Sequence, residues 1–79
     1  MEDEYLKAFG DHFYKLRVTR SISRVQLAFE VNTTEKHLRL IEKGEISTGL
    51  KTLYRIAKAL EITVPDLMNI GQDSDTINE

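Results

Sequence analysis

Apolar side chains recur along the chain at helical spacing, in short segments separated by turn residues. In the first segment, residues 5 to 18, the large apolar side chains are three, four and three positions apart: Leu6, Phe9, Phe13 and Leu16. That spacing puts them on one face of an amphipathic helix. No segment alternates between apolar and polar positions as a half-buried strand would, so the pattern favours an all-α fold.

Capping signals predict a second helix and a sharp turn after it. Ser23 followed by Gln26 has the spacing of a capping box, in which each side chain meets a free amide at the helix start. The second helix should run from residue 24 to about residue 30. Asn32 then stands where the chain must turn, and asparagine tolerates the left-handed backbone conformation better than most residues.

Three more helices are predicted. Thr33 or Thr34 can cap a third helix that runs to about residue 42, and Gly44 is placed to end it. A fourth helix is marked by apolar residues at helical spacing: Leu50, Leu53, Ile56, Ala57 and Leu60. Thr63 to Asp66 repeats the capping spacing and predicts a short fifth helix. We expect the leucine, isoleucine and phenylalanine residues on these faces to form the core.

Charge is distributed unevenly, although the 79 residues carry a formal net charge of only −2. Residues 1–4 and 71–79 hold six of the 13 acids and no bases, so residues 5–70 carry 11 bases against seven acids. The excess of four positive charges lies between residues 15 and 43. We therefore expect one basic domain over residues 5–70, an acidic N-terminal tail over residues 1–4 and a disordered acidic tail over residues 71–79.

Two short helices joined by a tight turn, within a basic five-helix pattern, indicate a helix-turn-helix that reads duplex DNA. Four motifs also occur in order: FGxxFxKLR at 9–17, SxxxLA at 23–28, TTxxxLxxIEKG at 33–44 and LxTLxRIAKAL at 50–60. On these motifs, residues 9–68 resemble the phage repressor and Cro type of helix-turn-helix domain, the XRE family. The resemblance implies a compact five-helix bundle of the lambda-repressor-like type.

Several positions depart from the pattern of that family. Ser21 replaces the usual glycine before the second helix, Arg24 replaces a common glutamine, and Asn32 replaces the turn glycine. Leu40 occupies a position where the family commonly has a polar side chain that contacts bases, and leucine cannot hydrogen-bond to a base edge. Either Leu40 meets a thymine methyl group, or sequence reading is weaker in this protein.

The resemblance makes residues 34 to 42 the recognition helix and implies candidates for base contacts: Thr34, Glu35, Lys36 and Arg39. Lys36 or Arg39 would favour guanine, and Glu35 could accept a hydrogen bond from the amine of cytosine. Candidates for phosphate contacts are Ser23, Arg24, His37 and Lys43. By the same resemblance, Arg17 pairs with Glu42 in a structural role.

The resemblance also implies a homodimer that places two recognition helices in successive major grooves of a roughly palindromic operator. Six apolar residues fit less well on the predicted core faces: Val25, Ile46, Tyr54, Ile62, Met68 and Ile70. Surplus apolar side chains near the fourth and fifth helices would supply a two-fold interface. A cognate toxin or another protein is a further candidate partner, since antitoxins occur in this family.

Other functional classes find little support in the sequence. His12 and His37 lie on different helices, cysteine is absent, and there is no glycine-rich phosphate loop, so we expect no enzyme, no metal site and no cofactor. No apolar run approaches the length of a membrane span, and the acidic start is unlike a secretory signal, which favours the cytoplasm. The alternative that stays open is a helix-turn-helix fold used as a protein-interaction or adaptor module without specific DNA binding.

Overall fold

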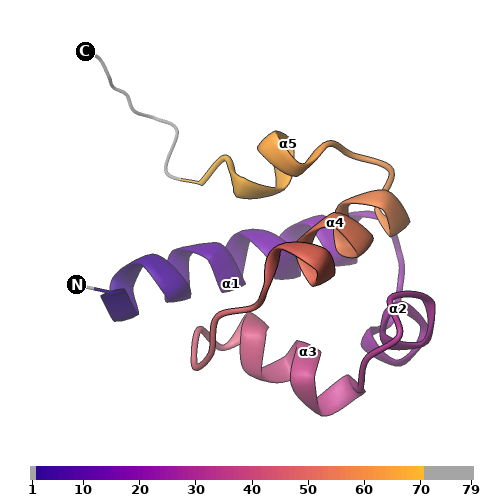
Figure 1. Ribbon diagram of the computed structural model, residues 1–79, viewed down its shortest axis with the longest axis horizontal. Helices are drawn as coiled ribbons and strands as arrows, with labels where there is room; N and C mark the ends of the chain where they lie inside the picture. The colour runs from indigo at the N-terminus through magenta and orange to yellow at the C-terminus, as the bar shows by residue number, and fades with distance from the viewer. Residues whose placement is uncertain (1, 71–79) are drawn as a thin grey trace.

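The computed structural model describes residues 2–70 and contains five α-helices in that range. In chain order they are α1 (Glu2–Thr19), α2 (Arg24–Glu30), α3 (Glu35–Glu42), α4 (Leu50–Ala59) and α5 (Val64–Met68). α1 crosses the length of the molecule and packs against α3 on one side and α5 on the other (Figure 1). α2 and α3 also pack together, away from α5. The predicted all-α five-helix fold is confirmed; the predicted tail at 71–79 lies outside the described residues.

The first helix begins earlier than the apolar pattern predicts. α1 already includes residues 2–4, which the apolar pattern placed before the first helix, so this helix is longer at its N-terminal end than predicted. Acidic residues are favoured in the first turn of a helix because its free amide groups carry partial positive charge. Apolar periodicity misses such a turn, because Glu4 and Tyr5 are exposed and contribute nothing to the buried face.

Side-chain caps start three of the helices. The hydroxyl oxygens of Ser23, Thr34 and Thr63 accept hydrogen bonds from backbone amides three residues further on, at 3.0, 3.0 and 3.1 Å. Of the two threonines considered for α3, Thr34 is therefore the cap. Each bond satisfies an amide that has no partner within the helix.

Three residues other than glycine adopt the left-handed conformation at the ends of helices: Ser21 (φ 59°), Asn32 (φ 61°) and Glu61 (φ 61°). Asn32 makes the turn between α2 and α3, as predicted. Ser21 lies in the connection between α1 and α2, two residues after α1 ends, at a position where the family that the sequence resembles usually has glycine. Its left-handed backbone conformation is the one that glycine adopts most easily.

The core lies where the helices meet. Its fully buried large side chains come from all five helices, from the turn after α2 and from the residue that follows α4: Phe13, Leu27, Val31, Leu38, Ile41, Ile56, Leu60 and Leu67. Leu50 was expected on the buried face of α4 but is 79 % exposed, because it lies at the first turn of that helix, one turn before the packed region. Of the six apolar residues that fitted poorly, Val25 and Tyr54 are also exposed. The other four pack against the core: Ile46, Ile62, Met68 and Ile70.

Gly10 allows α1 to approach α3 closely. A Cβ atom at this position would clash with the backbone carbonyl oxygens of Ile41 and Glu42, at the end of α3. Because these are main-chain atoms, a side chain at position 10 would have to push the two helices apart. The position of α3 relative to α1 is thus fixed by a backbone contact.

Candidate nucleic-acid interface

α2, a four-residue turn and α3 form a rigid unit. The turn is held by hydrogen bonds from Val31 N to Leu27 O at 2.9 Å and from Thr33 N to Ala28 O at 2.9 Å. Leu27, Ala28 and Val31 are buried on the inner side of this unit, together with Leu38 of α3. The remaining face of α3 is left for contacts outside the domain.

The four candidates for base contacts lie at the start and on the outer side of α3, but they differ in availability. Thr34 is exposed, and its hydroxyl oxygen is used as the helix cap. Lys36 is exposed and makes no ion pair within the part of the chain that the structure describes. Glu35 and Arg39 pair with each other, with Arg39 Nη1 donating to Glu35 Oε1 at 3.1 Å. Lys36 is therefore the most available cation of the set.

The candidates for phosphate contacts are spread over both helices of the unit. Ser23 is exposed at the start of α2, and its hydroxyl can still donate a hydrogen bond while it accepts one from the amide of Gln26. Arg24 follows it and is half-buried. His37 is half-buried within α3, and Lys43 is exposed at its end. The structure thus brings Ser23 and Arg24 to one helix start and leaves Lys43 about two and a half turns of α3 away from Thr34.

The structure contains the ion pair expected between Arg17 and Glu42. Arg17 Nε donates to Glu42 Oε2 at 2.6 Å and Nη2 donates to Oε1 at 3.3 Å, so the pair is bidentate. Arg17 Nη1 also donates to the carbonyl oxygen of Ile22 at 2.8 Å, and the guanidinium lies 5.4 Å from the ring centroid of Tyr14. The two charged side chains are only 8 % and 7 % exposed. They therefore link α1, the chain before α2, and α3 inside the domain.

A series of alternating charges continues from this pair toward the outer face of α3. Arg24 Nε lies 3.7 Å from Glu42 Oε1 and also 3.7 Å from Glu35 Oε2. Together with the pairs at its two ends, the series runs Arg17, Glu42, Arg24, Glu35 and Arg39. Of these contacts, only the pair of Arg17 and Glu42 was predicted from the sequence; those of Arg24 and Glu35 were not. The separation of four residues between Glu35 and Arg39 could have indicated the last pair, because residues i and i+4 are neighbours on a helix; the contacts of Arg24 depend on how α2 crosses α3.

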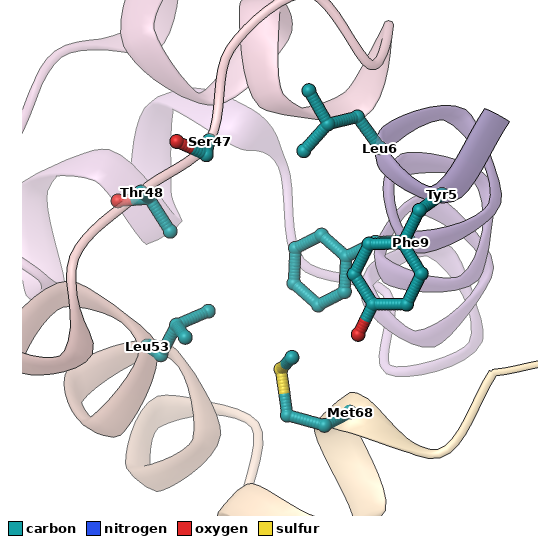
Figure 2. Close-up of a pocket in the computed structure, with 7 residues that line it drawn as sticks. All are labelled: Tyr5, Leu6, Phe9, Ser47, Thr48, Leu53 and Met68. Carbon is teal, nitrogen blue, oxygen red and sulfur yellow. The ribbon is translucent and has the colours of Figure 1, made fainter. Parts of the chain in front are cut away.

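One apolar pocket lies on another part of the molecule. It has a volume of about 170 Å³ and is lined by residues of α1, the loop before α4, α4 and α5: Tyr5, Leu6, Phe9, Ser47, Thr48, Leu53 and Met68 (Figure 2). Its polar atoms are hydroxyl and backbone groups, without a carboxylate, imidazole or amine. Among residues 2–70 there is also no cluster of three or more side chains that could hold a metal ion. None of the helices in that range is long and apolar enough to cross a membrane.

Comparison with known proteins supports the arrangement of α2 and α3. The family model described as Helix-turn-helix (HTH_3) matches residues 13–67. A search of curated proteins found no match. Among solved structures, the restriction-modification controller protein C.AhdI from Aeromonas hydrophila is 27 % identical, with a TM-score of 0.76, over 78 % of this chain and 94 % of its own.

Two larger regulators contain a similar domain. An HTH_3 family transcriptional regulator from Vibrio cholerae is 25 % identical, with a TM-score of 0.76, over 85 % of this chain and 38 % of its own. The competence regulator ComR from Streptococcus vestibularis is 30 % identical, with a TM-score of 0.76, over 95 % of this chain and 24 % of its own. With the family match, these similarities establish that the chain belongs to the XRE-type helix-turn-helix family of DNA-binding transcriptional regulators.

Proposed function

We propose that this chain is a sequence-specific transcriptional regulator that places α3 in the major groove of duplex DNA. The observation that carries the proposal is the outer side of α3, where the exposed Lys36 stands beside the partly exposed Arg39, over a helix whose inner side is packed in the core. A lysine or arginine in the major groove recognises guanine through its O6 and N7 acceptors.

Of the four sequence candidates for base contacts, Lys36 and Arg39 are the proposed principal readers, with Thr34 beside them. The carboxylate of Glu35 is engaged by two arginines and is the weakest candidate for a direct base contact. Leu40 is half-buried on α3, and its apolar side chain can contact a thymine methyl group but cannot hydrogen-bond to a base. Phosphate contacts are assigned to the four residues inferred from the sequence: Ser23, Arg24, His37 and Lys43. Arg24 makes such a contact only when its guanidinium leaves the carboxylate of Glu35, 3.7 Å away.

We also propose a homodimer that binds a roughly palindromic operator, with its two recognition helices about 34 Å apart. Leu50 and Tyr54, four residues apart on α4, are 79 % and 57 % exposed. Exposed apolar groups of this kind are enriched where protein surfaces meet. Sedimentation at tens of micromolar protein would reveal the dimer, and a strictly monomeric profile with and without DNA would remove this part of the proposal.

A second candidate function is that of a protein-interaction or adaptor module, and one surface feature of α2 favours it. Val25 and Phe29 are one helical turn apart, and Phe29 is 86 % exposed. A partner protein, such as a cognate toxin, is the kind of molecule that would cover such a pair. In either role the chain acts as a binding protein in the cytoplasm, without catalysis and without a cofactor.

Selection of bound sequences from a random duplex library tests the primary proposal and separates it from the adaptor function. A regulator should enrich one sequence, and its affinity should fall steeply as salt rises, because bound phosphates release counterions. Substitution of Lys36 by alanine should weaken binding to the enriched sequence. Absence of binding at every salt concentration would instead support the adaptor function.

A further inference from the structure

Glu35 lies between two arginines that the proposed function places near DNA. Its carboxylate oxygens are 3.1 Å from Arg39 Nη1 in α3 and 3.7 Å from Arg24 Nε in α2. A single glutamate at the start of α3 thus partly compensates one cation on each helix of the helix-turn-helix unit.

These contacts are partly shielded from solvent. The side chains of Arg24 and Glu35 are 32 % and 33 % exposed, whereas the ordinary surface pair of Lys15 and Asp11 is 72 % and 64 % exposed. Charges that are partly buried are screened less by dissolved salt than fully exposed ones. Arg24 is held further by Glu42, at 3.7 Å on its other side.

A carboxylate and a phosphate compete for the same guanidinium groups. Both accept charge-assisted hydrogen bonds from arginine, and both fit its planar set of donors. An arginine that remains with Glu35 neutralises no phosphate and therefore releases no counterion from DNA. Glu35 accordingly lowers the part of the binding energy that is independent of base sequence.

The pair inside α3 leaves part of Arg39 available. Only Nη1 of Arg39 contacts Glu35, and within residues 2–70 no hydrogen bond occupies its Nε or Nη2. Glu35 therefore restrains the side chain of Arg39 while leaving donors for the acceptors of guanine. A side chain that is ordered before binding loses less conformational entropy when it binds.

We propose that Glu35 is a specificity-determining residue that acts through Arg24 and Arg39. It substitutes for a DNA phosphate inside the protein, which weakens binding to arbitrary duplex DNA, and it holds Arg39 for reading a base. In this role Glu35 contacts arginine side chains and not the amine of a cytosine. The inference rests on the proposed DNA-binding function.

The test compares the full chain with its Glu35→Gln variant by fluorescence anisotropy, on a duplex enriched by selection and on a duplex of arbitrary sequence. Log affinity falls as log salt rises, and each additional neutralised phosphate makes this slope steeper by about 0.9. When salt is lowered fourfold, from about 200 to about 50 mM, the variant should gain more affinity for the arbitrary duplex than the unmodified chain does. The additional gain is about 3.5-fold for one released arginine and about 12-fold for two. The ratio of affinity for the selected duplex to affinity for the arbitrary duplex should therefore be lower for Glu35→Gln than for the unmodified chain.

Two further variants separate release of arginines from loss of negative charge. Glu45→Gln removes the same charge from an exposed carboxylate that makes no ion pair in the described part of the chain, and it should leave the salt slope unchanged. Adding Arg24→Gln to Glu35→Gln should reduce the magnitude of the salt slope on the arbitrary duplex by about 0.9 relative to Glu35→Gln alone, because the arginine that Glu35 would have released is then absent. The far-ultraviolet circular dichroism spectrum of each variant reports whether it is folded.

Three results would overturn the inference. One is a Glu35→Gln variant whose salt slope matches that of Glu45→Gln, since charge alone would then explain any gain. Another is loss of affinity for the selected duplex without a gain on the arbitrary one, which would make Glu35 a direct DNA contact. The third is that the unmodified chain binds neither duplex at low salt, in which case the DNA-binding function fails and this inference fails with it. If the unmodified chain binds DNA but Glu35→Gln leaves the salt slope unchanged, only the inference is wrong.

Discussion

Substitution of Arg17 by methionine removes one charge of the buried pair while keeping an unbranched side chain in the same space. The carboxylate of Glu42, only 7 % exposed, then loses its bidentate partner and keeps Arg24 at 3.7 Å. Breaking a buried pair by removing one partner typically costs about 3 to 5 kcal/mol, because the other charge is left uncompensated. Since Arg24 compensates part of that charge, we expect a loss near the lower figure, about 3 kcal/mol.

Such a loss is large for a chain of this size. A domain of 79 residues has a free energy of unfolding of about 4 to 12 kcal/mol at the usual value per residue. A loss of about 3 kcal/mol lowers the Tm of a domain of 60 to 100 residues by roughly 12 to 24 °C. Thermal and urea unfolding followed by circular dichroism at 222 nm, a wavelength that reports about equally on all helices, measure both quantities.

A double variant tests whether the charge pair itself explains the loss. Glu42→Leu alone leaves Arg17 buried with the carbonyl oxygen of Ile22, so it should cost at least as much as Arg17→Met. The combination of the two replaces both charges by apolar groups and should be more stable than either single variant. Lys15→Met is the matched control, because its exposed pair with Asp11 contributes about 0 to 1 kcal/mol.

Either of two results would contradict a stabilising, energetically coupled pair of Arg17 and Glu42. If Arg17→Met lowers the free energy of unfolding by less than about 1 kcal/mol, the buried pair contributes no more than an exposed pair does. Strict additivity of the two substitutions in the double variant would show that the two side chains are not energetically coupled.

Three other variants test separate features of the structure. Ser21→Gly should raise the free energy of unfolding by about 0.5 to 1 kcal/mol in urea titrations, because Ser21 has φ 59°; a loss would contradict the strain argument. Gly10→Ala should lower it by about 1 to 3 kcal/mol, since its Cβ meets the backbone of α3, and unchanged stability would contradict that close contact. Lys36→Ala should reduce affinity for the selected duplex by about 1 to 3 kcal/mol in anisotropy titrations, whereas an equal loss on all duplexes would make Lys36 a phosphate contact.

Local signals in the sequence were sufficient for most of the fold. Ser23, Asn32 and Thr63 act on neighbouring backbone atoms, so their roles follow from residue type and spacing, and the structure places each as predicted. The start of α1 and the exposure of Leu50 were predicted wrongly for a common reason. Apolar periodicity finds the part of a helix that packs, and the first turns of α1 and α4 extend beyond that part.

The candidate interface was only partly predictable for a different physical reason. The identity of α3 follows from the motif, but the partners of Arg24 come from two positions of another helix, at 3.7 Å each. Such contacts depend on the angle and distance between α2 and α3, which residue spacing along one helix does not specify. The sequence therefore indicates which side chains carry charge, whereas the structure indicates which of them are already compensated.

The main-chain contact at Gly10 fixes the position of α3 through backbone atoms, whereas the side chains on the outer face of α3 determine what the helix can bind. Because the carbonyl oxygens of Ile41 and Glu42 meet the backbone of α1, the tilt of this helix does not depend on its outward side chains. Positions 36 and 39 can therefore be exchanged among residue types while the helix keeps its orientation. Under the proposed function, one or two substitutions at these positions should change the operator preference without moving the helix.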